Sequence, residues 1–142
     1  MSLVGKACEK GILDISVVNP RDYAAKRGVA DDYPYGGGPG MVMMVEPVKL
    51  AIDDVSTSQK GKKQTINLSP QGSVFQQKDV STLLSFDHII LVAGRYEGID
   101  DRVNRYVDRE YSVGDFVVSG GEIPAILMID ALVRHIPGVL GD

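Results

Sequence analysis

The chain has 142 residues, of which 44% are hydrophobic and 24% charged, so it can fold as one domain around a buried core. This composition excludes intrinsic disorder, and no apolar run reaches the roughly 18 to 20 residues that cross a bilayer. The net charge of −4 gives no global sign of a nucleic-acid-binding protein. The first residues carry no apolar signal region, and the single cysteine, Cys8, fits a reducing cytoplasm and an ordinary helical position.

The first half of the chain contains two expected strands and one expected helix. Ile12–Val18 is rich in β-branched residues and ends at an Asn-Pro turn signal, which predicts a strand. A long polar and glycine-rich loop follows as far as Gly40, and loops of this length are usually functional or mobile. Met44–Val55 has its apolar residues at helical spacing, with Pro47 tolerated in the first turn. Thr65–Ser69 is a short strand that ends at Pro70.

The second half alternates in the same way. Gln76–Ser85 predicts a helix, and the continuous apolar run His88–Gly94 is typical of a central parallel strand. Asp100–Tyr111 is ambiguous between a helix and a helix followed by a strand. Asp115–Ser119 predicts a strand, and Gly121–Gly138 predicts a final helix with a Pro-Gly end.

Strands that alternate with helices predict an α/β fold with a mainly parallel sheet flanked by helices. In such sheets ligands bind beyond the carboxyl ends of the strands. The glycine-rich bends "LSPQG", "GRYEG" and "SVGDF" to "SGGE" all fall at or near the ends of expected strands. Glycine allows the main chain to turn sharply and lets a ligand approach it closely. The bends therefore predict a cleft lined by backbone N–H and C=O groups.

Standard catalytic motifs are absent from the sequence. It contains no dinucleotide fingerprint, no P-loop, no serine-hydrolase elbow and no Cys or His pair at metal-ligand spacing, so no metal is expected. His88 and His135 fit structural roles better than catalytic ones. Local basic clusters fit a solvated surface, and for the arginines a binding role is an equal alternative; the clusters are Arg21, Lys26 and Arg27, then Lys60, Lys62 and Lys63, then Arg95, Arg102, Arg105 and Arg109.

Five motifs in order resemble those of the bacterial tRNA (guanine-N1)-methyltransferases, a family of the SPOUT superfamily. They are "DDYPYGGGPGM", "LSPQG", "GRYEGIDDRV", "YSVGDFVVSGGE" and "RHIPGVLG", and the likeness extends from about Val4 onward. "MSL" does not resemble the family and fits an added leader. The resemblance implies that residues 1–142 form a SPOUT catalytic and cofactor-binding domain whose C-terminal part threads through a loop as a deep trefoil knot. Periodicity alone could not predict a knot, because knots are almost absent from proteins.

The resemblance also implies the reaction. The family transfers a methyl group from S-adenosyl-L-methionine to N1 of the guanosine 3′ of the anticodon in tRNA, and it holds the cofactor in the knot. By position, the implied cofactor-binding residues are Leu68, Ser69, Pro70, Gly94, Val113, Gly114, Asp115, Phe116, Val117, Val118, Gly120 and Gly121. Main-chain groups of such bends can match the donors and acceptors of adenine, with Val and Leu side chains covering the ring.

Two residues match catalytic positions of the family. Guanine N1 must lose a proton to a base, and negative charge then develops on O6, where a cation is stabilising. Arg134 matches the arginine that serves at O6; its alternative role is a cation at a helix C-terminus. Glu97 matches a residue that positions the cofactor or the guanine; its alternative role is an exposed turn carboxylate. Asp31, Pro39 and Asp100 match substrate-binding positions.

The sequence departs from the family's pattern in three ways. Tyr33 stands where many relatives carry a basic residue, which puts a phosphate contact there in doubt. The family begins with a further strand and helix, so a sheet edge is expected to be exposed. The family continues into a C-terminal tRNA-binding domain, and its general-base aspartate lies beyond Asp142. We therefore expect these residues to bind the cofactor without turnover.

The resemblance implies two partners, tRNA and a second copy of the chain. The family is an antiparallel homodimer whose active sites lie at the interface, and Ile126, Ile129 and Val133 either line that interface or face the core. Three alternatives remain: a cofactor-binding module without activity, another SPOUT RNA methyltransferase that acts on a ribose, and an unrelated nucleotide-binding α/β domain.

Overall fold

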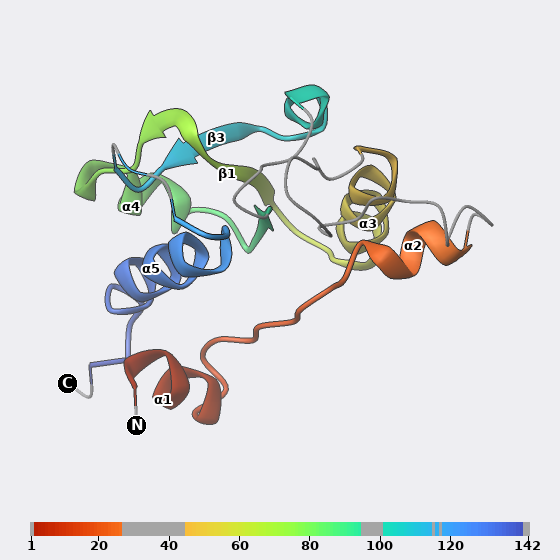
Figure 1. Ribbon diagram of the computed structural model, residues 1–142. Coiled ribbons are helices and arrows are strands. Elements are labelled where there is room, and N and C mark those ends of the chain that lie inside the picture. Colours follow the sequence, from red (N-terminus) through yellow and green to blue (C-terminus); the bar gives the residue numbers. More distant parts are fainter. Residues whose placement is uncertain (1, 27–44, 95–100, 115, 117, 141–142) are drawn as a thin grey trace.

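The fold is a three-stranded sheet surrounded by helices (Figure 1). The computed structural model describes residues 2–26, 45–94, 101–114, 116 and 118–140. The elements in chain order are α1 (Leu3–Glu9), α2 (Arg21–Lys26), α3 (Val45–Ser58), β1 (Lys63–Val74), α4 (Gln77–Leu83), β2 (His88–Ala93), the 3-10 helix η2 (Asp101–Tyr106), β3 (Arg109–Ser112) and α5 (Glu122–Val133). In these described ranges, no helix has the length and apolarity that crossing a membrane requires.

The sheet has the order β2-β1-β3, and both strand pairs are parallel. The predicted α/β class with a parallel sheet flanked by helices is therefore confirmed. β1 pairs with β2 from Lys63↔His88 to Leu68↔Ala93. Parallel neighbours need long connections, and here a helix lies in each connection, α4 between β1 and β2 and η2 between β2 and β3.

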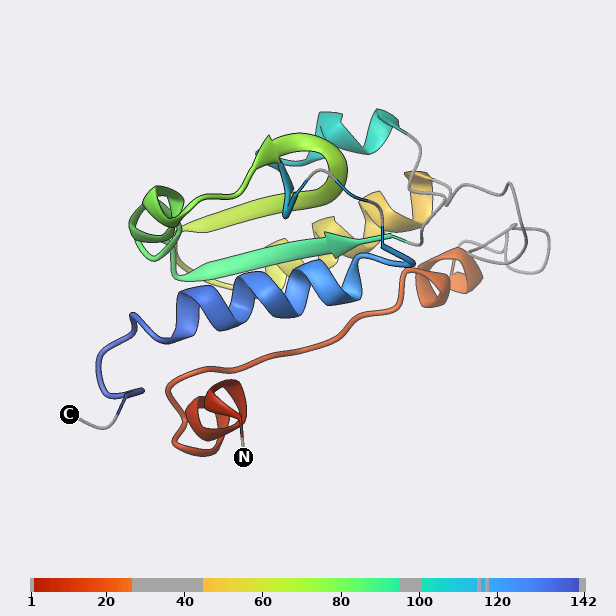
Figure 2. The same ribbon diagram turned by 60° about the vertical axis from the view of Figure 1, so that its left-hand side comes forward.

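Helices cover both faces of the sheet (Figure 2). Because side chains alternate along a strand, Ile66 and Leu68 of β1 face one side, where they pack with α4 and α5. Val92 of β2 faces the other side, where it packs with α3 and η2. The main core cluster is completed by Val80, Leu83, Tyr111, Met128 and Leu132. The apolar side chains of β2 pack on both faces, although only Val92 is fully buried and β2 lies at an edge of the described sheet, not at its centre as the sequence predicted.

The predicted helices form where the apolar spacing placed them. α3 buries Val48, Ala51 and Ile52, and Pro47 lies in its first turn as expected. α4 begins where the Asp79 carboxylate accepts the Gln76 backbone N–H at 2.8 Å, which satisfies a donor that the helix leaves open. The ambiguous segment 100–111 contains a short helix followed by a strand.

The N-terminal helix packs against the segment after α5. Ala7 of α1 is buried with Val133 and Val139. Lys10 Nζ donates to the Gly138 carbonyl oxygen at 3.4 Å. Gly138 has a φ of +89°, which favours glycine, and this turn brings the chain back onto α1. Two segments at opposite ends of the sequence thus form one small cluster.

Two predicted strands are wrong. Residues 12–18 form no strand, and Val17 is 94% exposed, because β-branched residues make a strand only where another strand pairs with them. Phe116, Val118 and Ser119, the described residues of the strand expected at 115–119, are also outside any strand; the strand lies earlier, at β3. β1 is longer than expected and continues past Pro70.

Candidate functional site

The carboxyl ends of the three strands lie side by side. Leu68 of β1 is in register with Ala93 at the end of β2 and with Tyr111 near the end of β3. Since all three strands are parallel, the segments that follow them leave the sheet at the same edge. The segments after β2 and β3 and the irregular part of β1 after Leu68 are the bends predicted to hold the cofactor, and the register brings Leu68, Gly94 and Val113 to one region.

The first bend is an excursion within β1. Leu68 and Ser73 are both in register with Tyr111, so the residues between them bulge out of the ladder. Gly72 lies directly on β3: a Cβ built there would be 2.7 Å from the backbone carbonyl carbon and oxygen of Glu110 and from the Tyr111 nitrogen. Any larger residue at this position would push the bend away from β3.

The second bend, after β3, is held by a serine. The Gly114 backbone N–H donates to Ser112 Oγ at 3.1 Å, and Ser112 Oγ donates to the Gly114 carbonyl oxygen at 2.8 Å. Ser112 is buried, so this side chain replaces solvent for both main-chain groups. The ring of Phe116 lies over Gly114 and is 55% exposed, which leaves an apolar surface at the bend.

The end of β2 meets the start of α5. The Gly121 N–H donates to the Gly94 carbonyl oxygen at 2.6 Å. A Cβ on Gly121 would be 2.7 Å from Ala93 Cα, so only glycine allows this close approach of helix and strand. Gly94, Gly120 and Gly121 are all buried. The glycines assigned to the cofactor therefore also join the helix to the sheet.

A buried polar network supports the same edge of the sheet. Asn67, 6% exposed, donates from Nδ2 to Asn104 Oδ1 at 3.1 Å and, more weakly, to Glu110 Oε2 at 3.5 Å. Asn104 Nδ2 donates to the same Glu110 oxygen at 3.4 Å. The network ties η2 to β1 and β3 just before the bends, and it fixes Leu68 by holding its neighbour.

Arg134 lies away from the bends. It is the C-cap residue of α5, whereas Gly121 is the N-cap residue, and a helix of twelve residues is about 18 Å long. Figure 2 shows α5 beginning beside the end of β2 and running back along that strand. Arg134 is exposed, and the next residue is tied to α4 by a 3.1 Å contact between Gln77 Nε2 and His135 Nε2. Within one chain the structure does not bring Arg134 to the cofactor bends.

A phenol–carboxylate contact anchors the helix before the long glycine-rich loop. Tyr23 Oη of α2 donates to Asp54 Oδ2 of α3 at 2.5 Å. This hydrogen bond, followed by desolvation and the negative charges of Asp54 and Asp22, raises the pKa of the Tyr23 phenol. α2 was not expected from the sequence. Its signal is Asn19, whose Oδ1 accepts the Arg21 N–H at 3.0 Å in the manner of a helix cap.

The predicted site residues fall into three groups. Glu97, Asp31, Pro39, Asp100, Asp115 and Val117 lie outside the described residues. Arg134 lies at the far end of α5. The structure brings the rest to the bends at one sheet edge: Leu68, Ser69, Pro70, Gly94, Val113, Gly114, Phe116, Val118, Gly120 and Gly121.

The chemistry of the described site is that of a main-chain binding region. It offers backbone donors and acceptors, apolar side chains and small residues. In the part of the chain that the structure describes, no group of three or more His, Cys, Asp or Glu residues is placed to hold a metal ion. The residue that the sequence analysis missed is Ser112; a serine two residues before a glycine after a strand is the signal for such a turn.

The sequence is similar to a known family of enzymes. The chain matches the tRNA (guanine-1)-methyltransferase TrmD family over residues 1–142. It is 51% identical over 142 residues to the tRNA (guanine-N(1)-)-methyltransferase of Photobacterium profundum, 51% over 141 residues to that of Pseudoalteromonas translucida and 50% over 142 residues to that of Vibrio cholerae. These alignments cover 98 to 99% of the chain but only 55 to 58% of the relatives. The chain belongs to the tRNA (guanine-1)-methyltransferase family.

Proposed function

We propose that the protein transfers a methyl group from S-adenosyl-L-methionine to N1 of the guanosine 3′ of the anticodon in tRNA, in the cytoplasm. The observation that carries this proposal is the convergence of three glycine-containing bends at one sheet edge, in a chain of this family. The 142 residues correspond to the domain that holds the cofactor, and we include the trefoil knot of the SPOUT fold in the proposal.

The described bends fit an adenosyl group. Backbone N–H and C=O groups near Leu68, Gly94 and Gly114 would match the donors and acceptors of adenine, and the half-buried Val113 and exposed Phe116 would cover its ring. The close contacts of Gly72 and Gly121 with neighbouring backbone would keep these bends in place before the ligand arrives. S-adenosyl-L-methionine supplies its methyl group as an electrophilic sulfonium.

In this reaction the protein has to remove the proton from guanine N1 and stabilise the negative charge on O6. A base must take the N1 proton, and a cation must stabilise the negative charge that develops on O6. Arg134 is assigned to O6 because its motif resembles that of the family's catalytic arginine, and it is an exposed guanidinium. Glu97, with Asp31, Pro39 and Asp100, is assigned to positioning the cofactor and guanine. We assign no general base to these 142 residues.

A dimer would bring the two ends of the site together. α5 carries exposed apolar side chains at Ile123 (55%), Ile126 (62%) and Leu127 (52%), whereas Val133 belongs to the core. A second copy packed isologously on this face would cover the apolar surface. Such a pairing would also place Arg134 of one chain near the bends of the other chain. In its own chain, Arg134 is separated from the bends by the length of α5, about 18 Å.

Isothermal titration of the chain with S-adenosyl-L-methionine tests the proposal. We expect one cofactor site per chain and equal binding of S-adenosylhomocysteine, which shares the adenosyl group. Absence of binding, together with binding of another nucleotide, would favour an unrelated nucleotide-binding domain.

Methyl transfer to a tRNA transcript, followed by nuclease digestion, locates the product. Label on N1 of the guanosine 3′ of the anticodon supports the proposed reaction. Label on a ribose would favour another SPOUT enzyme. For these 142 residues we expect cofactor binding without transfer, because no general base is assigned to them.

A further inference from the structure

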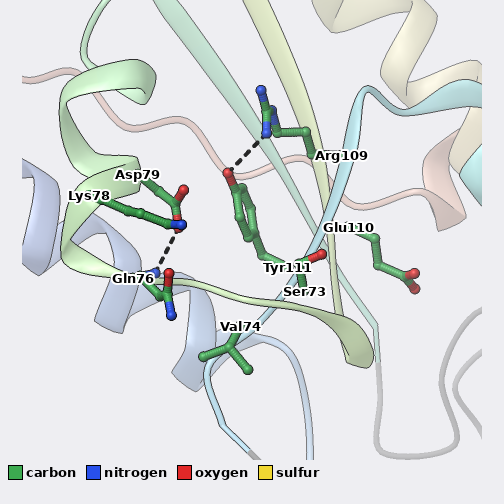
Figure 3. Close-up of a pocket in the computed structure, with 8 residues that line it drawn as sticks. All are labelled: Ser73, Val74, Gln76, Lys78, Asp79, Arg109, Glu110 and Tyr111. Carbon is green, nitrogen blue, oxygen red and sulfur yellow. Dashed lines mark hydrogen bonds between the residues drawn. The ribbon is translucent and has the colours of Figure 1, made fainter.

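A polar pocket lies beside the bends but outside the set of proposed site residues. It has a volume of about 330 Å³ and lies between the last part of β1, the start of α4 and β3 (Figure 3). Its lining residues are Ser73, Val74, Gln76, Lys78, Asp79, Arg109, Glu110 and Tyr111. Ser73 follows Gly72 of the first bend, and Tyr111 precedes Ser112 of the second. The pocket therefore adjoins the first and second bends.

The two acids of the pocket already have partners. The Asp79 carboxylate accepts the Gln76 N–H at 2.8 Å. Glu110 is turned away from Arg109 and Tyr111 in Figure 3, and its carboxylate accepts from the amides of Asn67 and Asn104. These hydrogen bonds hold both carboxylates in place, on helix α4 and in the polar network of the sheet, but their donors are neutral, so both acids keep their negative charge.

The two cations of the pocket lack such partners. Lys78 and Arg109 are exposed, and neither forms an ion pair within the described ranges. Figure 3 shows them on different walls, Lys78 on α4 and Arg109 on β3. Two unpaired cations facing one polar pocket are suited to an anion.

The buried hydroxyl of Tyr111 also favours an anion in the pocket. Tyr111 is only 4% exposed, and its ring packs edge-on against Phe75 with centroids 5.6 Å apart. Its hydroxyl accepts a long hydrogen bond of 3.5 Å from Arg109 Nη1, and for its own proton no acceptor is found among the described residues. A buried donor is normally satisfied, so an acceptor in the pocket would complete this group.

We propose that Arg109, Tyr111 and Lys78 form a binding site for a backbone phosphate of the RNA substrate. This inference rests on the proposed function for its choice of RNA. A phosphate offers several acceptors and one negative charge, which matches a guanidinium, a hydroxyl donor and an ammonium. These 142 residues have a net charge of −4, so any contact that they make with RNA depends on local cations such as Arg109 and Lys78.

The test measures binding of a labelled RNA hairpin with the anticodon stem-loop sequence. Fluorescence anisotropy gives the affinity at several salt concentrations between about 50 and 200 mM. Arg109→Ala is expected to weaken binding several-fold and to lower the slope of log K against log salt by about 0.7 to 1. Tyr111→Phe keeps the ring and removes only the hydroxyl, so it is expected to weaken binding about two- to tenfold.

Lys60→Ala is the matched control, because it also removes one exposed positive charge but lies before the opposite end of β1. It is expected to stay within about twofold of wild type. Equal losses in Arg109→Ala and Lys60→Ala would overturn the inference, since overall charge would then explain both. Full affinity in Tyr111→Phe would overturn the role of the hydroxyl.

Two further measurements separate this site from others. Titration with inorganic phosphate and with a nucleoside monophosphate tests for a free ligand: Arg109-dependent binding of these, with unchanged RNA affinity in all variants, would overturn the assignment to RNA. Titration with S-adenosyl-L-methionine is expected to be unchanged in each variant, which also shows that each is folded. If the wild type does not bind S-adenosyl-L-methionine, the proposed function is refuted, but the comparison of RNA affinities between the variants and the wild type still tests the phosphate site.

Discussion

Gly121→Ala tests whether the close approach of α5 to β2 holds the candidate site together. Gly121 has a φ of −73°, which alanine adopts without strain, so the effect must come from the contact and not from the backbone conformation. The new Cβ would be 2.7 Å from Ala93 Cα and 2.9 Å from Ala93 Cβ. Carbon atoms prefer about 3.5 to 4.0 Å, so the helix start must move by roughly 1 Å.

That movement also stretches the 2.6 Å hydrogen bond from the Gly121 N–H to the Gly94 carbonyl beyond bonding distance. Overpacking costs about 1 to 3 kcal/mol and the lost hydrogen bond about 1 kcal/mol. Replacing glycine by alanine restricts the unfolded chain and returns about 0.4 to 1 kcal/mol. The expected net loss is therefore about 2 kcal/mol, which lowers the melting temperature by about 6 to 8 °C in a domain of this size.

Thermal unfolding followed by circular dichroism measures this loss, and Ser119→Ala is the matched control. Ser119 is exposed and lies in the same segment, so its variant is expected within about 0.5 kcal/mol of wild type. Cofactor titration on the same samples should show weaker binding in Gly121→Ala alone. Equal melting of the two variants would refute the idea that the glycine is required by close packing.

Three other predictions concern the stability and assembly of the chain. Tyr23→Phe removes the hydroxyl that donates to Asp54. The pKa of Tyr23 is raised in the folded state, so this hydrogen bond stabilises the fold below the unfolded pKa of about 10, and the stabilisation is lost as the pH rises through the folded pKa. In urea unfolding, the variant should therefore be less stable than wild type at neutral pH and equally stable above the folded pKa. Leu83→Ala should cost about 2 to 5 kcal/mol in urea unfolding, because Leu83 is fully buried between α4 and the sheet. Ile126→Asp places a charge on the exposed face of α5 and should shift sedimentation from dimer to monomer; an unchanged monomer in both proteins would contradict the proposed pairing.

Periodicity and apolar runs predict most of the helices and the location of β1 and β2, but β2, expected as a central strand, lies at an edge of the described sheet, and β1 is central. The spacing of Val48, Ala51 and Ile52 identifies α3, and the apolar run of β2 identifies a strand, in which only Val92 is fully buried. These signals are local, because the spacing of apolar residues within a segment is enough to identify the face that the segment buries. Glycine after a strand likewise identifies the bends, and the structure brings the described ones together.

Pairing between distant segments is what the sequence could not show. Residues 12–18 have the composition of a strand, but a strand forms only where another segment offers its hydrogen bonds. β1 continues past Pro70 because Ser73 and Val74 return to pair with Tyr111 and Ser112, which no local pattern indicates. The same limit applies to Arg134, whose motif predicts a place in the site although the helix before it leads away from the bends.

The position of Arg134 connects the proposed reaction to the proposed assembly. Helix α5 must start at Gly121, because only glycine fits against Ala93, and its twelve residues then carry Arg134 about 18 Å from the cofactor bends. A cation assigned to guanine O6 must lie close to the methyl donor when the proton leaves N1. Both requirements are met only if a second chain supplies the arginine, so a strictly monomeric enzyme with full transfer activity would contradict the assignment of Arg134 and not the cofactor site.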